Sequence, residues 1–143
     1  MKKFRDEKEF RQVFEHVFEL MNQTPAVGRK LRDARAPHRF LITDLGLEFN
    51  VTAAPDADEA KGRFLRWTWG PADWEPVVTM KMASDVANRF FQGKESVALA
   101  LALGRVKLSG PPLTLLQLAP VTNPIHPVYR AWLKKSGLEH LLA

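Results

Sequence analysis

Apolar residues recur every three or four positions near the start of the chain, with charged side chains between them. This spacing predicts an amphipathic helix that buries one face. A shorter helix is expected after Thr24 and Pro25, because threonine often caps a helix and proline suits its first turn. It should end before Pro37. The buried positions of the first helix are Phe10, Val13, Phe14, Val17 and Met21.

From residue 38 the hydrophobic pattern changes to a period of two, which is typical of half-buried strands. The first two strands flank residues 44–46, a short connection that suits a hairpin. Residues 55–62 are polar and are expected to form a loop. Because each strand has one apolar and one polar face, we expect an α+β fold with a five-stranded, largely antiparallel sheet covered by helices on one face. The other three strands are expected over residues 63–69, 77–82 and 105–109.

The later part of the chain contains further candidate helices. Ser84 can cap a helix that ends at Gly93. The segment after Pro112 is apolar enough for a core helix, and the tail after Pro127 returns to amphipathic spacing. Residues 96–103 read SVALALAL and stay ambiguous, because strict alternation favours a strand whereas alanine and leucine favour a helix.

Composition narrows the class of protein. The 143 residues suit one domain, and 45% hydrophobic with 26% charged residues is ordinary for a folded protein. There is no cysteine, which excludes disulfides and thiolate metal sites. No stretch approaches the roughly 18 apolar residues that a membrane span needs, and the start of the chain carries acids where a secretory signal would be apolar. We therefore expect a cytoplasmic protein.

The local signatures of catalytic sites are missing. There is no Gly-x-Ser-x-Gly turn, no phosphate-binding glycine loop and no His-Glu-x-x-His motif. Folding can gather scattered residues, but the sequence favours a protein without enzymatic activity, metal or cofactor. The four histidines lack the spacing of metal ligands; they are His16, His38, His126 and His140.

Basic residues raise the alternative of nucleic-acid binding, and the net charge is +5. A basic stretch precedes the sheet, and the polar face of the sheet carries five basic side chains against the single acid Glu48. Sheets that bind single strands pair such charge with exposed aromatic rings, whereas the strand aromatics here fall mostly on the apolar face. Nucleic acid is therefore disfavoured, and contact with an anionic membrane surface is kept as an alternative. The five basic side chains are Arg39, Arg66, Lys81, Arg105 and Lys107.

One segment resembles a known family. Residues 77–118 read VVTMKMASDVANRFFQGKESVALALALGRVKLSGPPLTLLQL. A Thr-x-Met strand, a short helix, Gly93-Lys94 and then Gly104-Arg-Val-Lys-Leu-Ser-Gly110 follow one another in this segment. This order and spacing resemble the C-terminal half of the sterol carrier protein 2 (SCP2) domain. The first half of the chain fits more loosely, with a long helix, a hairpin and a third strand.

The resemblance implies an SCP2-like domain over residues 1–119, in which SVALALAL is a helix. The chain departs from the family pattern at Pro111-Pro112 and in a C-terminal extension, residues 120–143. We expect the amphipathic helix of this extension to pack on the same domain. The resemblance also implies an apolar tunnel between sheet and helices for a lipid such as a sterol, fatty acid or acyl-CoA, and no catalytic residues. The candidate lipid-binding residues are Phe49, Trp67, Trp69, Met80, Met82, Phe90, Val97, Leu101, Leu115 and Leu116.

Each of these residues has an alternative role in an ordinary packed core, and periodicity does not separate a filled core from a cavity. Lipid binding is the leading hypothesis. The second is an accessory protein-interaction domain without a bound lipid, and the third is a basic nucleic-acid-binding domain.

Overall fold

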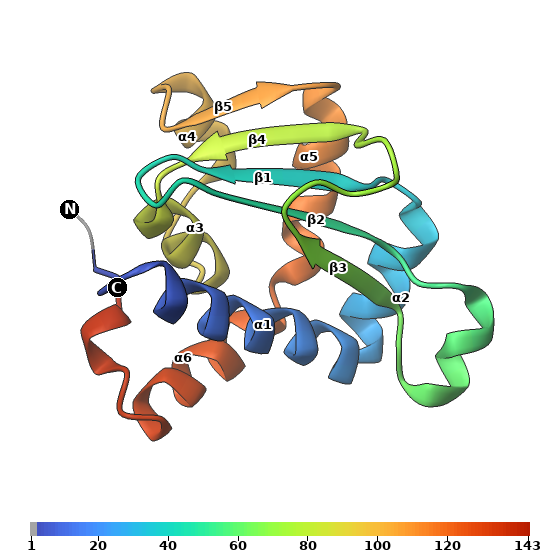
Figure 1. Cartoon of the computed structure of the whole chain (residues 1–143), viewed down its shortest axis with the longest axis horizontal. Helices are drawn as coiled ribbons and strands as arrows, with labels where there is room; N and C mark the ends of the chain where they lie inside the picture. Colours follow the sequence, from blue (N-terminus) through green and yellow to red (C-terminus); the bar gives the residue numbers. More distant parts are fainter. Residues whose placement is uncertain (1–2) are drawn as a thin grey trace.

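A five-stranded sheet forms the centre of the computed structural model, which describes residues 3–143 (Figure 1). Its strands are β1 His38–Ile42, β2 Leu47–Ala53, β3 Leu65–Trp69, β4 Val78–Met82 and β5 Val106–Ser109. Their spatial order is β3-β2-β1-β4-β5. Neighbours are antiparallel except β1 and β4, which run parallel. The expected five-stranded, largely antiparallel sheet is confirmed.

The register of the sheet follows from its alternating side chains. Phe40 of β1 lies opposite Phe49 of β2 and Met80 of β4. These three side chains are buried on one face, together with Ile42 and Met82. A slip by one residue would turn this whole apolar set outward, so burial fixes the pairing.

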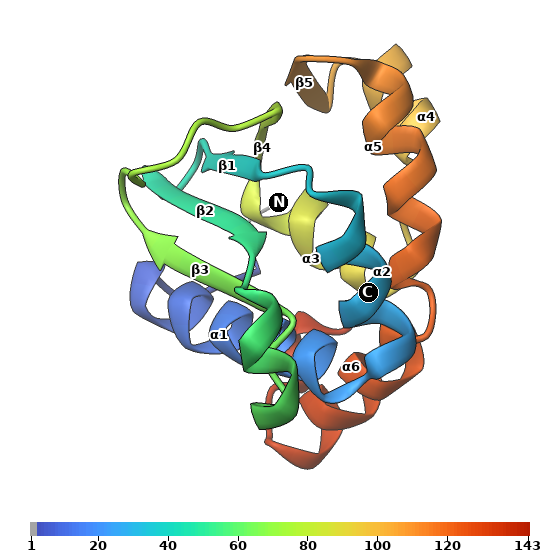
Figure 2. The ribbon, with the colours of Figure 1, turned by 90° about the vertical axis from the view of Figure 1, so that its right-hand side faces the viewer.

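Helices cover one face of the sheet (Figure 2). α1 lies under β3, and α4 and α5 lie at the opposite edge, beside β5 (Figures 1 and 2). No helix within residues 3–143 combines the length and apolar character that crossing a bilayer requires. The helices are α1 Glu7–Gln23, α2 Pro25–Ala34, α3 Ser84–Phe91, α4 Val97–Ala102, α5 Pro112–Leu118 and α6 Ile125–Lys135.

The ambiguous SVALALAL segment is a helix, as the family resemblance implied. Ser96 caps it, because its side chain accepts a hydrogen bond of 3.2 Å from the backbone N–H of Leu99. Only Ala100 of this helix is fully buried, whereas Leu99 and the C-cap Leu103 are exposed. The helix therefore lies at the edge of the core and covers it with one narrow face.

Aromatic side chains of α1 form the core beneath β2 and β3. Phe10, Phe14 and Phe18 are buried and lie on the same face of the helix. All three rings contact Phe49, whose ring also stacks on that of Phe40 at a centroid distance of 4.5 Å. The aromatic residues of the first helix thus pack against the sheet.

Local details differ from the sequence expectation at three places. The expected loop at residues 55–62 contains a 3₁₀ helix, Asp56–Lys61, anchored by a 2.6 Å ion pair between Arg32 and Glu59. Thr24 does not cap α2, because its hydroxyl donates to the carbonyl of Leu20 in α1. Ser84 does not cap α3 either, because its hydroxyl donates to Asp44 in the β1–β2 turn.

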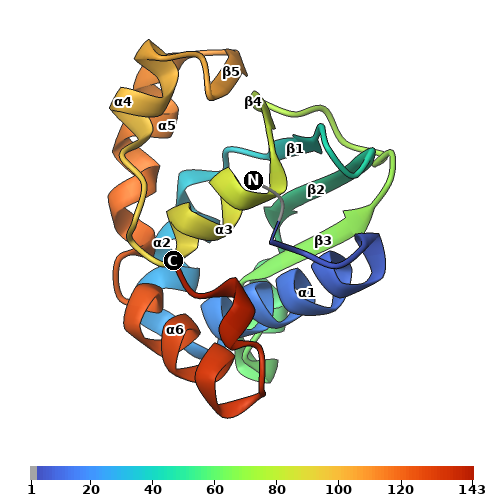
Figure 3. The same cartoon turned by 90° about the vertical axis from the view of Figure 1, so that its left-hand side faces the viewer.

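The segment after residue 119 packs against α1 and α3 (Figure 3). The hydroxyl of Tyr129 donates to Asn88 Oδ1 at 2.7 Å. Asn88 Nδ2 and Gln92 Nε2 both donate to the carbonyl of Leu141 at 2.8 Å. Tyr129, Leu133 and Leu141 have no exposed surface, so this segment is part of the hydrophobic core.

The outer face of the sheet is less open than the sequence suggests. The guanidinium of Arg66 lies 4.9 Å from the ring centroid of Trp74, a residue of the β3–β4 connection. Arg105 is bound to the carboxylate of Glu95. Two of the five basic side chains expected on this face are therefore engaged by the protein itself.

An apolar cavity between the sheet and the helices

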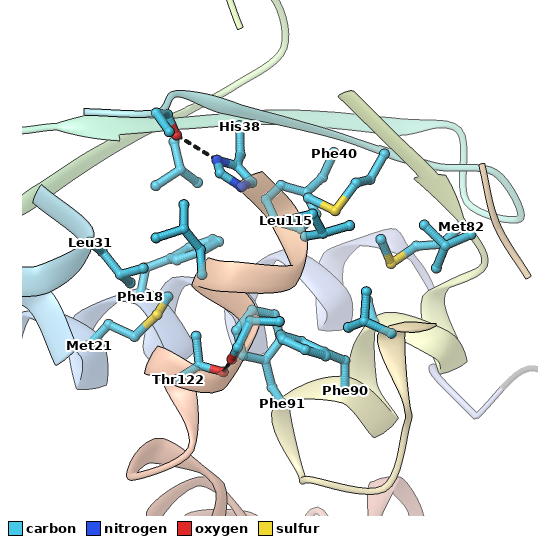
Figure 4. Close-up of a pocket in the computed structure, with 18 of the residues that line it drawn as sticks. Phe18, Met21, Leu31, His38, Phe40, Met82, Phe90, Phe91, Leu115 and Thr122 are labelled. Atoms are coloured by element: carbon cyan, nitrogen blue, oxygen red, sulfur yellow. Dashed lines mark hydrogen bonds between the residues drawn. The ribbon is translucent and has the colours of Figure 1, made fainter. Parts of the chain in front are cut away.

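A cavity of about 110 Å³, partly open to solvent, lies between the sheet and the helices (Figure 4). All five strands contribute to one wall, β3 through its first residue Leu65, and helices α1 to α5 form the others. Most lining residues are apolar, and four are polar: His38, Thr52, Glu95 and Thr122. A space with this lining favours apolar contents over water.

Five of the ten candidate lipid-binding residues line this cavity. Met80 and Met82 come from β4, and their spacing of two places them on the same face. Phe90 belongs to α3, Val97 to α4 and Leu115 to α5. These five residues, far apart in sequence, meet because three helices cover the β1–β4–β5 half of the sheet.

The other five candidates lie outside the cavity lining. Phe49 is fully buried among the α1 rings. Trp67 and Trp69 turn toward α1, where both indole N–H groups donate to Glu15. Leu101 packs at the edge of the core, and Leu116 is 40% exposed because it follows Leu115 around α5 and points away. The alternation of the strands gave the correct face for the tryptophans, but the position of α1 fills the space beneath them.

Several lining residues were not among the candidates. Phe18 extends the apolar face of α1 by one turn beyond Phe14, and Leu31 comes from α2. Phe40 and His38 precede Ile42 with a spacing of two, so all three side chains lie on one face of β1. That spacing was available in the sequence, where His38 was instead grouped with the basic residues around it.

Glu95 is the one acidic group in the lining, and it is paired. Its side chain is only 5% exposed, and it accepts hydrogen bonds from Arg105 at 2.6 Å and from Arg89 at 2.9 Å. Burial raises the pKa of this carboxyl, but the two arginine hydrogen bonds outweigh burial and hold the pKa below its usual range. Glu95 therefore stays ionised and joins the end of α3 to the start of β5.

His38 lines the cavity from the start of β1. Its Nδ1 lies 2.5 Å from the backbone carbonyl oxygen of Ala36. Burial lowers the pKa of this imidazole, and the hydrogen bond to Ala36 only partly offsets that effect. The ring is therefore neutral near pH 7.

The ionisable side chains of the described residues are scattered. Within residues 3–143, no three histidine, aspartate or glutamate side chains come together in a way that could hold an ion. The polar side chains that face the cavity are one neutral imidazole, the hydroxyl of Thr122 and one paired carboxylate, because Thr52 alternates with the inward-facing Val51. This arrangement suits binding of an apolar molecule.

Comparison with solved structures identifies the fold. The sterol carrier protein domain 2 of Helicoverpa armigera matches 80% of this chain and 88% of its own, with a TM-score of 0.57 and 18% identity. Sterol carrier protein 2 from Yarrowia lipolytica matches 88% of this chain and 95% of its own, with a TM-score of 0.57 and 11% identity. The chain has the SCP2 fold. At these identities the likeness concerns the fold alone.

The SCP2 fold is also matched within a longer enzyme. A stereoselective inverting sec-alkylsulfatase from Pseudomonas sp. aligns with 73% of this chain at a TM-score of 0.58 and 19% identity. The aligned part is 15% of the sulfatase chain. No protein-family model and no curated protein matches the sequence.

Proposed function

We propose that this protein is a non-catalytic lipid-binding domain that holds an apolar molecule in the cavity between its sheet and its helices. The observation that carries the proposal is the cavity itself, whose lining is apolar apart from four residues. A solid core with the same surface pattern would have left no such space. The solved structures of sterol carrier proteins support the proposal by their fold.

The driving force would be removal of apolar surface from water. Each buried methylene group contributes about 0.8 kcal/mol, so an eight-carbon chain gains roughly 6 kcal/mol before the costs of ordering are subtracted. No hydrogen bond is needed for such an affinity. Selectivity for the apolar part of the ligand would be low.

The size of the cavity determines what can enter without movement. A volume of about 110 Å³ is below the roughly 300–1,000 Å³ of most ligand pockets. A full-length lipid therefore requires the cavity to widen. The wall formed by α4 and α5 is suited to this, because these two short helices bury few of their side chains. Four leucines at this wall are exposed: Leu99, Leu103, Leu113 and Leu116.

Native mass spectrometry of gently purified protein tests whether a lipid is bound. The proposal predicts an added mass that organic extraction removes, and uptake of the neutral fluorescent probe N-phenyl-1-naphthylamine by the extracted protein. A protein that carries no lipid and does not take up the probe would overturn it.

A pair of neighbouring substitutions locates the ligand. Leu115 lines the cavity and is 6% exposed, whereas the adjacent Leu116 points outward. Leu115→Trp should fill the cavity and reduce probe affinity at least tenfold. Leu116→Trp, in the same helix, should leave the affinity unchanged. Equal effects of the two substitutions would place the ligand elsewhere.

The alkylsulfatase match favours a second candidate, an accessory module of a larger assembly. In that case the domain would contribute contacts to a partner, and the cavity would be a packing defect. Native mass spectra that show no bound lipid, together with a probe affinity that Leu115→Trp leaves unchanged, would favour this alternative.

A further inference from the structure

The imidazole of His38 points from β1 into the cavity (Figure 4). Its Nδ1 contacts the carbonyl oxygen of Ala36. A carbonyl oxygen can only accept a hydrogen bond, so Nδ1 must carry the hydrogen. In a neutral ring the other nitrogen, Nε2, then has a free lone pair and acts as an acceptor.

In the described part of the chain, this acceptor lacks a partner. Within residues 3–143, no side chain or backbone group forms a hydrogen bond with Nε2 of His38. Its nearest aromatic neighbour in the strand is the apolar ring of Phe40, at a centroid distance of 6.4 Å. A group that donates to this unpaired acceptor is favoured, because the rest of the cavity lining is mostly apolar.

The other polar residues of the lining are less suited to this role. The carboxylate of Glu95 is occupied by two arginines. The hydroxyl of Thr122 donates to the carbonyl of Ala119 at 2.8 Å. Thr52 follows the inward-facing Val51 on β2, so its side chain points toward the opposite face of the sheet. His38 therefore provides the free acceptor at one end of an otherwise apolar space.

We propose that His38 selects ligands carrying a hydroxyl group, which donates a hydrogen bond to Nε2 while the apolar body of the ligand fills the cavity. This inference rests on the proposed lipid-binding function and names the ligand class: neutral alcohols with an aliphatic or alicyclic body. An ionised carboxylate lacks a donor, would face the lone pair of Nε2 and would lose its hydration in an apolar space. The site thus favours an alcohol over the carboxylate of the same length.

Calorimetric titration with two isomers tests the proposal. 1-Octanol and 1-methoxyheptane contain the same atoms, but only the alcohol has an O–H donor. One neutral hydrogen bond corresponds to about a three- to tenfold difference in affinity. The wild-type protein should bind 1-octanol more tightly by this factor, and it should bind octanoate more weakly than 1-octanol at pH 8.

Two substitutions assign the preference to His38. His38→Phe retains a ring without the acceptor, so it should bind the two isomers with equal affinity. Thr122→Val is the matched control, and it should keep the preference. Equal binding of the isomers by the wild-type protein, or loss of the preference in Thr122→Val alone, would overturn the assignment of His38.

A measurement on the wild-type protein covers the case in which His38→Phe does not fold. The ¹⁵N resonance of Nε2 should shift when 1-octanol is added and stay in place when the ether is added. The same shift with both compounds would contradict the proposal.

The titrations also separate this proposal from the lipid-binding function on which it rests. Binding of both isomers with equal affinity removes the role of His38 but leaves the lipid site. Binding of neither compound removes the lipid site and the His38 assignment together.

Discussion

The indole N–H of Trp69 donates a hydrogen bond of 2.6 Å to the carboxylate of Glu15. Trp67, two residues earlier on β3, donates to the other oxygen of the same carboxylate at 2.9 Å. One glutamate of α1 thereby orients both tryptophans and holds the helix against the edge strand of the sheet. The two rings consequently serve to attach α1 and do not line the cavity.

Glu15→Ala should lower the free energy of unfolding by about 1 kcal/mol, because two partly exposed hydrogen bonds are lost. Probe affinity should not change. Urea denaturation measures the first quantity and fluorescence titration the second. Glu19→Ala, one turn further along α1, is the control, because no tryptophan donates to Glu19 within the described chain. A loss of probe affinity in Glu15→Ala at unchanged stability would move the ligand toward the tryptophans.

Glu95→Gln should destabilise the protein by about 2 kcal/mol. The substitution removes the negative charge between Arg89 and Arg105 at a buried position, where breaking an ion pair is costly. Glu59→Gln removes a comparable contact, 2.6 Å from Arg32, at a side chain that is 42% exposed. This control should destabilise the protein clearly less than Glu95→Gln, because solvent screens the exposed pair. Equal effects in thermal denaturation would show that burial does not strengthen the Glu95 pairs.

Tyr129→Phe should lower the free energy of unfolding by about 1 kcal/mol. It removes only the hydroxyl that donates to Asn88, in a region where burial raises the pKa of the phenol far above its usual value. Val128→Ala, at an exposed position in the same helix, should have little effect. A Tyr129→Phe protein as stable as the wild type would mean that Asn88 is satisfied by Gln92 alone.

Acid should destabilise the fold through His38. Its pKa in the folded protein lies below the ordinary value of 6.5, so the unfolded chain binds more protons as the pH falls below about 6.5. The stability that the neutral ring contributes is complete above that pH and declines down to the folded pKa. Burial also lowers the pKa of His16 and of His126, which adds to the decline.

The contribution of His38 is the difference between two pH profiles. Urea denaturation of wild type and His38→Phe between pH 5 and pH 8 should give curves whose slopes differ below pH 6.5, with the variant less sensitive to acid. Parallel curves would mean that His38 titrates as it does in the unfolded chain.

Periodicity was sufficient to predict the faces of the strands, because burial of one face is a local property of alternating residues. It placed Met80 and Met82 on the covered side correctly. It could not predict that β1 and β4 run parallel, since pairing depends on how the β3–β4 connection crosses the sheet. It also could not separate cavity from core, because Phe49 and Phe40 share one face of the sheet, yet only Phe40 lies where the helices leave space.

The polar part of the cavity was harder to predict than its apolar part. Glu95 and Arg105 are ten residues apart and meet only because α4 returns the chain to the sheet. The role of His38 depends on its contact with a backbone carbonyl two residues earlier. Neither the ion pair of Glu95 nor the hydrogen bond of His38 can be predicted from the charges of the residues in the sequence. Only the folded chain therefore distinguishes the neutral His38 from the basic residues beside it.

Met80 and Met82, on one strand of the parallel pair β1–β4, allow the cavity wall to change its shape. Each thioether side chain is unbranched and has three rotatable bonds, so it passes between rotamers without displacing the backbone. Two such side chains in one wall let the hydrogen-bonded strands stay fixed while the outline of the cavity changes. Ligands whose apolar parts differ in shape would thus fit the cavity while the imidazole of His38 stays in place on the rigid sheet.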